Sequence, residues 1–219
     1  MTMSEIRQPR SFNQLDAWLS IVTLFFLLSL SGFILCPAFQ SAFPTVSIST
    51  IEYISIIPIS LIPIIYLSFR YGWIGIADFF LRGSDIAVLA ISLIIVVITF
   101  SIISLAVPYA SLALYGEISL LPRFEYLITI VYIFLIGPFL EETLFRKYIY
   151  EIYRSKYGIL SAILTTAFFE TLQHIGYWDI KTLIMIFLFT VFLTLIYAKS
   201  RLGVSVIMHC LINFFIYYF

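Results

Sequence analysis

Charged residues are scarce in this chain, because aspartate, glutamate, lysine and arginine make up only 11% of its 219 residues. A soluble domain carries about 25% charged and about 45–50% apolar residues, whereas this chain is 62% hydrophobic. The shortage of charge therefore excludes a soluble domain and predicts an integral membrane protein. The twelve basic and twelve acidic residues cancel, so bulk charge gives no indication of a nucleic-acid partner.

Several catalytic signatures are also missing from the sequence. The two cysteines, Cys36 and Cys210, lie at the end of the first apolar run and inside the last one, so no disulfide framework is indicated. No G-x-S-x-G elbow, no H-E-x-x-H helix and no G-x-G-D segment occurs. These absences argue against a serine-type nucleophile, a zinc-protease helix and an aspartyl intramembrane protease.

What the chain has in abundance is long apolar runs. Seven of them are long enough, or nearly so, to cross a bilayer as helices, which takes about 20 residues each. They cover residues 16–35, 51–69, 86–107, 124–150, 159–176, 183–198 and 202–219, and prolines at 58 and 63 interrupt the second. We therefore predict an all-α bundle of about seven transmembrane helices, a single membrane domain over 1–219 with a short cytoplasmic tail at 1–15.

The orientation of this bundle follows from its basic residues. With a cytoplasmic N-terminus, ten of the twelve lysine and arginine residues lie on the cytoplasmic side, and only Arg123 and Lys181 lie outside. Membrane proteins concentrate positive residues in their cytoplasmic loops. The sequence thus predicts a multi-pass protein of the cell membrane, with its N-terminus in the cytoplasm and its C-terminus outside.

A few ionisable and amide side chains nevertheless fall inside the predicted spans, where each charge costs about 3 kcal/mol on insertion scales. They form pairs four residues apart, which places both members on one helix face about 6 Å apart. Because polar faces turn toward each other in lipid, three such faces should converge on one buried cluster. The set consists of Glu141, Glu142 and Arg146 in the fourth span, Glu170 and His174 in the fifth, and His209 and Asn213 in the last.

The two adjacent glutamates are predicted to have different roles. Glu142 and Arg146 form a neutralising ion pair that supports the site. Glu141 is rotated by about 100° around the helix and cannot share Arg146 equally. An unpaired buried carboxylate of this kind can act as a base, and Pro138 predicts a kink that frees backbone carbonyls nearby.

The remaining members of the cluster allow alternatives. A histidine in a core is usually structural, but His174 and His209 are the only two histidines and both face polar partners. Asn213 either donates with His209 to a developing oxyanion or bridges two helices. A carboxylate base beside a histidine can activate water for hydrolysis of a peptide-like bond. We expect no metal cofactor, with Zn²⁺ bound by the histidines and a glutamate as the alternative.

The order Glu141-Glu142-x-x-x-Arg146, then His174, then His209-x-x-x-Asn213 resembles the CPBP family, the CAAX prenyl protease and bacteriocin-processing (Abi) membrane proteins. The resemblance implies an intramembrane glutamate protease whose catalytic half is 124–219. It also implies a membrane-embedded or lipidated peptide substrate. In the family, the residues matching Glu141 and His174 activate water, those matching Glu142 and Arg146 support them, and those matching His209 and Asn213 stabilise the oxyanion.

Glu170 departs from the family pattern, which places a phenylalanine four residues before the histidine. A carboxylate beside His174 would favour the protonated imidazole and make it a poorer base. An alternative function is therefore a non-enzymatic membrane protein of bacteriocin immunity, or an accessory or scaffold protein with a degenerate protease site. Seven spans are one fewer than in eukaryotic-type prenyl endopeptidases, which favours an Abi-type protein of a prokaryotic plasma membrane.

Overall fold

The computed structural model describes residues 15, 18–19, 21–23, 36–106, 122–174 and 180–218. Every secondary-structure element within these ranges is helical, which confirms the predicted all-α class. The first expected span, 16–35, lies almost wholly outside the described residues. The helices are α2 (Cys36–Ala42), α3 (Ile48–Tyr71), η3 (Ile76–Asp78), α4 (Gly83–Ala106), α6 (Arg123–Val131), η4 (Tyr132–Ile136), α7 (Gly137–Glu142), η5 (Thr143–Tyr150), α8 (Glu151–Leu172), α9 (Ile180–Lys199) and α10 (Leu202–Tyr218).

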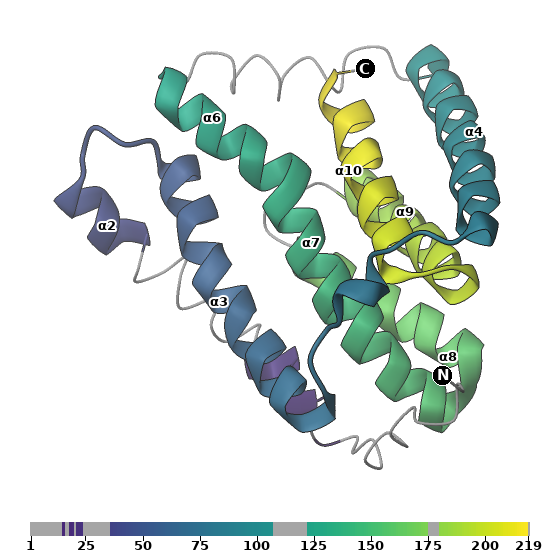
Figure 1. Cartoon of the computed structure of the whole chain (residues 1–219). Helices are drawn as coiled ribbons and strands as arrows, with labels where there is room; N and C mark the ends of the chain where they lie inside the picture. Colours follow the sequence, from purple (N-terminus) through teal and green to yellow (C-terminus); the bar gives the residue numbers. More distant parts are fainter. Residues whose placement is uncertain are drawn as a thin grey trace.

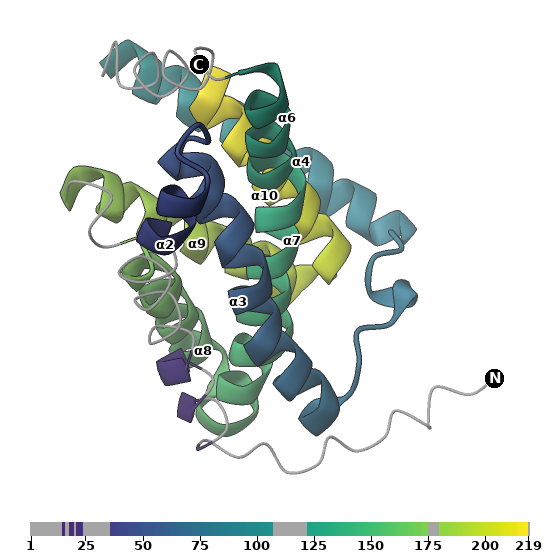
Figure 2. The same cartoon turned by 90° about the vertical axis from the view of Figure 1, so that its left-hand side faces the viewer.

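Helix α7 occupies the middle of the bundle. It contacts α3 on one side and α10 on the other, and α10 in turn contacts α4 and α9 (Figure 1). In the view from the side of α3, helix α3 stands in front of α7 and α10 (Figure 2). This arrangement places a short segment of the fourth predicted span at the centre of the molecule.

Several helices have the length and composition of membrane spans. Segments Ile54–Tyr71, Arg123–Leu172 and Ile180–Lys199 are long and apolar enough to cross a bilayer. Gly83–Thr99 and Leu202–Ile216 are shorter apolar helices. Many large apolar side chains on these helices are exposed, as expected of surfaces that face lipid rather than water.

Helix α3 differs from the prediction for the second span. Pro58 and Pro63 were expected to interrupt it, but the helix runs unbroken from Ile48 to Tyr71. The Ser47 hydroxyl accepts the Thr50 N–H at the start, and the Gly72 N–H donates to the Ser68 carbonyl at the end. In an apolar environment the loss of two helical hydrogen bonds costs less than leaving the rest of the backbone unpaired.

The chain from α6 to α8 is the longest helical stretch, and it breaks at Gly158. The backbone there has φ 81° and ψ 175°, a conformation that glycine adopts readily and that other residues avoid. The helical segment after the break packs back against η5, so Ile163 and Phe169 share a core with Phe145 and Ile149. Gly158 therefore separates the fourth and fifth predicted spans.

The connection between α3 and α4 is held tightly against the helices of the centre. Arg201 donates from Nη1 to the carbonyls of Ala77, at 2.8 Å, and Phe80, at 3.3 Å. The Phe79 ring stacks on Phe139 of α7 with centroids 5.5 Å apart. A Cβ atom at Gly203 would lie 2.4 Å from the Phe79 carbonyl oxygen, so α10 begins in direct contact with this connection.

Replacing Gly203 with alanine should destabilise the protein by about 1–3 kcal/mol, because the added methyl group overlaps a backbone carbonyl that cannot rotate away. Thermal unfolding in detergent micelles measures the effect. Gly83→Ala is the matched control, since a Cβ atom there meets nothing within 4 Å. Equal melting temperatures for the two variants would contradict the close packing of Gly203.

Candidate functional site

The helix that carries Glu141 widens on both sides of it. The flanking segments η4 and η5 are π-helical, whereas α7 between them is α-helical. Pro138, near the start of α7, has no N–H, and its ring would collide with the carbonyl four residues earlier in an ordinary helix. The Gly137 N–H donates to the Tyr132 carbonyl, five residues back. The kink expected at Pro138 thus takes the form of a π turn, a feature frequent at functional sites.

This π turn leaves the Ile133 carbonyl without a helical donor. Gly137 donates to Tyr132 instead, and Pro138 has no N–H to give. Asn213 of α10 supplies the donor, with its Nδ2 atom 2.9 Å from the Ile133 oxygen. Asn213 therefore joins two helices, while its second N–H and its carbonyl oxygen are left for other partners.

Asn213→Ala should destabilise the protein by about 1–3 kcal/mol, because it leaves the Ile133 carbonyl unsatisfied. Adding Pro138→Ala restores a backbone donor near that carbonyl, so the cost of losing Asn213 should be smaller in this background. Thermal unfolding of the two single variants and the double variant measures this coupling. Strictly additive costs would show that Pro138 and Asn213 act independently.

Arg146 is the centre of the polar cluster and is completely buried. Its Nη1 atom lies 3.2 Å from Glu142 Oε1 and also binds Glu170 Oε2 of α8. Its Nη2 atom lies 3.4 Å from the Thr190 carbonyl of α9. One guanidinium therefore ties together η5, α7, α8 and α9, and it bonds two carboxylates where the sequence indicated one.

His209 of α10 lies between the two adjacent glutamates. Its Nδ1 atom is 2.8 Å from Glu142 Oε1, and its Nε2 atom is 3.6 Å from Glu141 Oε2. The Glu141 side chain retains 26% of its exposure, whereas that of Glu142 is fully buried. Glu141 is thus the carboxylate of this pair that a substrate or a water molecule can reach.

Glu170 and His174 are arranged differently from the sequence expectation. The Glu170 carboxylate turns to Arg146, and only its backbone carbonyl meets His174, at 3.0 Å from Nδ1. Across the described residues, no hydrogen bond or ion pair joins His174 to Glu141, whose nearest charged partner is His209. The carboxylate of Glu170 therefore stabilises Arg146 rather than the His174 imidazole.

Three groups of the cluster also come close enough to share one ligand. The ligating atoms of Glu141, Glu170 and His209 all lie within 4.8 Å of one another. They belong to α7, α8 and α10, so only the folded bundle assembles them. A carboxylate, a second carboxylate and an imidazole can together bind a water molecule, move protons or hold a metal ion.

The polar cluster is the centre of the segment that matches a known protein family. Residues 123–215 match the family model described as type II CAAX prenyl endopeptidase Rce1-like. We call residues 123–215 the Rce1-like segment. The Rce1-like segment contains all seven residues of the cluster, and the predicted CPBP resemblance is confirmed. No curated protein and no solved structure matches the chain.

The match to a CAAX endopeptidase family model supports a protease in a membrane, in agreement with the apolar helices. The roles of individual residues in the Rce1-like segment stay predictions. One group of the polar cluster was not predicted from the sequence: the Thr190 carbonyl, which accepts a hydrogen bond from Arg146. A backbone carbonyl leaves no mark in a sequence, so only the packing of α9 against η5 could show it.

Proposed function

We propose that the protein is an intramembrane endopeptidase that hydrolyses a peptide bond of a lipidated, membrane-associated substrate. The observation that carries the proposal is the contrast between the carboxylates of the cluster. Glu142 and Glu170 are buried against Arg146, whereas Glu141 has no arginine partner among the described residues and is partly exposed beside His209. A carboxylate free of a guanidinium can take a proton from water.

The reaction begins with a water molecule bound by Glu141, and His174 at the end of α8 is proposed as the second residue that holds it. Glu141 takes one proton from the water, and the remaining hydroxide attacks the carbonyl carbon of the scissile bond. His209, held by Glu142, donates to the developing oxyanion, and the second N–H of Asn213 adds to this stabilisation. When the carbon–nitrogen bond breaks, Glu141 returns its proton to the leaving amine, so the enzyme ends as it began.

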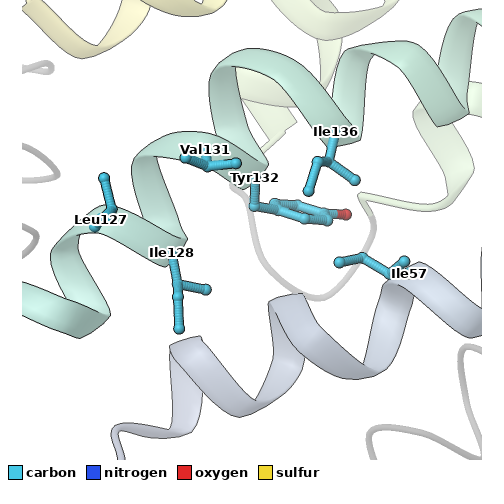
Figure 3. Close-up of a pocket in the computed structure, with 6 residues that line it drawn as sticks. All are labelled: Ile57, Leu127, Ile128, Val131, Tyr132 and Ile136. Atoms are coloured by element: carbon cyan, nitrogen blue, oxygen red, sulfur yellow. The ribbon is translucent and has the colours of Figure 1, made fainter.

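An apolar cavity lies close to this site and suits the lipid part of such a substrate. It has a volume of about 240 Å³ between α3 and the helix that leads to Glu141. Figure 3 shows the Tyr132 ring pointing from η4 toward Ile57 of α3, with Ile136 beside it. Ile136 precedes Glu141 by five residues, about 7.5 Å along the helix axis. The other lining residues are Leu127, Ile128 and Val131.

The proposal is tested with purified protein in liposomes and internally quenched peptides that carry a prenylated cysteine three residues before the C-terminus. The expected result is cleavage on the carboxyl side of that cysteine, faster than for the unprenylated peptide. Turnover of both peptides no faster than with Glu141→Gln protein would overturn the proposal and favour the non-enzymatic alternative. The predicted cytoplasmic N-terminus in a prokaryotic plasma membrane can be tested with reporter fusions at both termini.

A further inference from the structure

Glu170 brings a second carboxylate to the site of Glu141 and His209. The ligating atoms of the three side chains lie within 4.8 Å of one another, and they come from three helices. Glu170 also binds Arg146, so its place beside Glu141 and His209 calls for its own explanation.

The distances fit a small transition-metal ion. Zn²⁺ binds imidazole nitrogen and carboxylate oxygen at about 2.0–2.2 Å, so two ligands of one tetrahedral ion lie about 3.3 Å apart. His209 Nε2 and Glu141 Oε2 are already 3.6 Å apart. The Glu170 carboxylate has one oxygen on Arg146, and because the ligating atoms of the three side chains lie within 4.8 Å of one another, closing on one ion requires a shift of about 1.5 Å or less.

The imidazole of His209 is oriented as metal ligands usually are. Glu142 Oε1 lies 2.8 Å from Nδ1, so in the neutral imidazole a proton on Nδ1 faces Glu142 and the lone pair of Nε2 is available to a metal ion on the side of Glu141, whereas the protonated imidazole donates from Nε2. A carboxylate that holds the far nitrogen of a ligating histidine is the common outer-shell arrangement of zinc sites. Glu142 thus fixes both the tautomer and the ring orientation.

The charges of the cluster point to a divalent ion as well. The cluster holds three carboxylates, of Glu141, Glu142 and Glu170, and the single guanidinium of Arg146, which leaves an excess of two negative charges when His209 is neutral. The buried Oε2 atom of Glu142 has no hydrogen-bond partner among the described residues. Burying uncompensated charge is costly, so the cluster must take up protons or a cation, and the two compete for the same atoms.

We propose that Glu141, Glu170 and His209 form a binding site for a divalent transition-metal ion such as Zn²⁺, with one position open to water. Binding there occupies the carboxylate that the proposed function assigns as the base. The metal therefore inhibits hydrolysis. This second consequence rests on the proposed function, whereas the binding itself does not.

The test of binding uses Co²⁺ as a spectroscopic probe of the purified full-length protein, after removal of any affinity tag. Wild-type protein should develop the visible absorption of a tetrahedral Co²⁺ site, and Zn²⁺ should displace it with a stoichiometry of one. Glu141→Gln and Glu170→Gln should each weaken binding about 100-fold or more, and Glu142→Gln about 10–100-fold. Glu151→Gln is the control, because this half-exposed glutamate pairs with Arg154 outside the cluster.

Absence of a Co²⁺ spectrum, or equal binding by wild type and Glu141→Gln, would overturn the inference. Glu141→Gln keeps the Glu170–Arg146 ion pair, so this variant is informative even if Glu170→Gln unfolds. In the peptidase assay, Zn²⁺ should inhibit wild-type protein and a chelator should restore activity. Cleavage without metal binding refutes only the metal site, and metal binding without cleavage by any preparation refutes only the proposed function.

Discussion

Replacing Glu141 with glutamine lowers kcat/KM for a prenylated peptide by about 10²–10⁴-fold, the usual contribution of a general base. Glutamine has the same size and shape but cannot take a proton from water. The loss should appear in kcat/KM without unfolding, because the partly exposed Glu141 side chain makes only a 3.6 Å contact with His209. Initial rates in proteoliposomes, together with a melting curve of each variant, measure both quantities.

Two comparisons sharpen this experiment. Glu151→Gln changes a glutamate at the start of α8, outside the cluster, and should keep wild-type activity. The single variant His174→Ala should also lose peptidase activity, as Glu141→Gln does, since His174 is proposed to hold the same water molecule. A Glu141→Gln protein that keeps more than about one tenth of the wild-type rate would remove the assignment of Glu141 as the base.

The largest effect on stability is expected from Arg146→Met. Methionine fills much of the same space, but it leaves Glu142 and Glu170 buried without their cation. Removing one partner of a buried ion pair costs about 3–5 kcal/mol. We expect a strongly lowered melting temperature in detergent micelles, and faster proteolysis at a temperature where wild-type protein is resistant.

The control is Arg154→Met, because Arg154 is 46% exposed and lies 3.7 Å from Glu151. Exposed pairs of this kind contribute about 0–1 kcal/mol. A second substitution tests the cause: Glu170→Gln in the Arg146→Met background should recover part of the lost stability, since it removes one uncompensated charge. If the Arg146→Met and Arg154→Met variants had the same melting temperature, the buried ion-pair network would not be a main source of stability.

The sequence by itself determined the all-α class of this protein and identified the few polar side chains inside its predicted spans. Apolar runs of about 20 residues with few charges leave helices as the element that satisfies the backbone in lipid, and every secondary-structure element within the described residues is a helix. The i, i+4 spacing of Glu142 and Arg146 also placed them on one helix face, where they form an ion pair. Such local relations depend on helix geometry alone, so they can be read from the chain.

Only the tertiary structure decided which of these residues meet. Spacing along one helix related Glu170 to His174, but the packing of α8 against η5 turns the Glu170 carboxylate to Arg146. The packing of α10 against α7 and η4 places His209, rather than His174, beside Glu141. It also pairs Asn213 with the Ile133 carbonyl, which Pro138 leaves without a donor. Contacts between helices depend on rotation and depth in the bundle, which hydrophobic patterning sets only coarsely because the surfaces that face lipid and those that face other helices are both largely apolar.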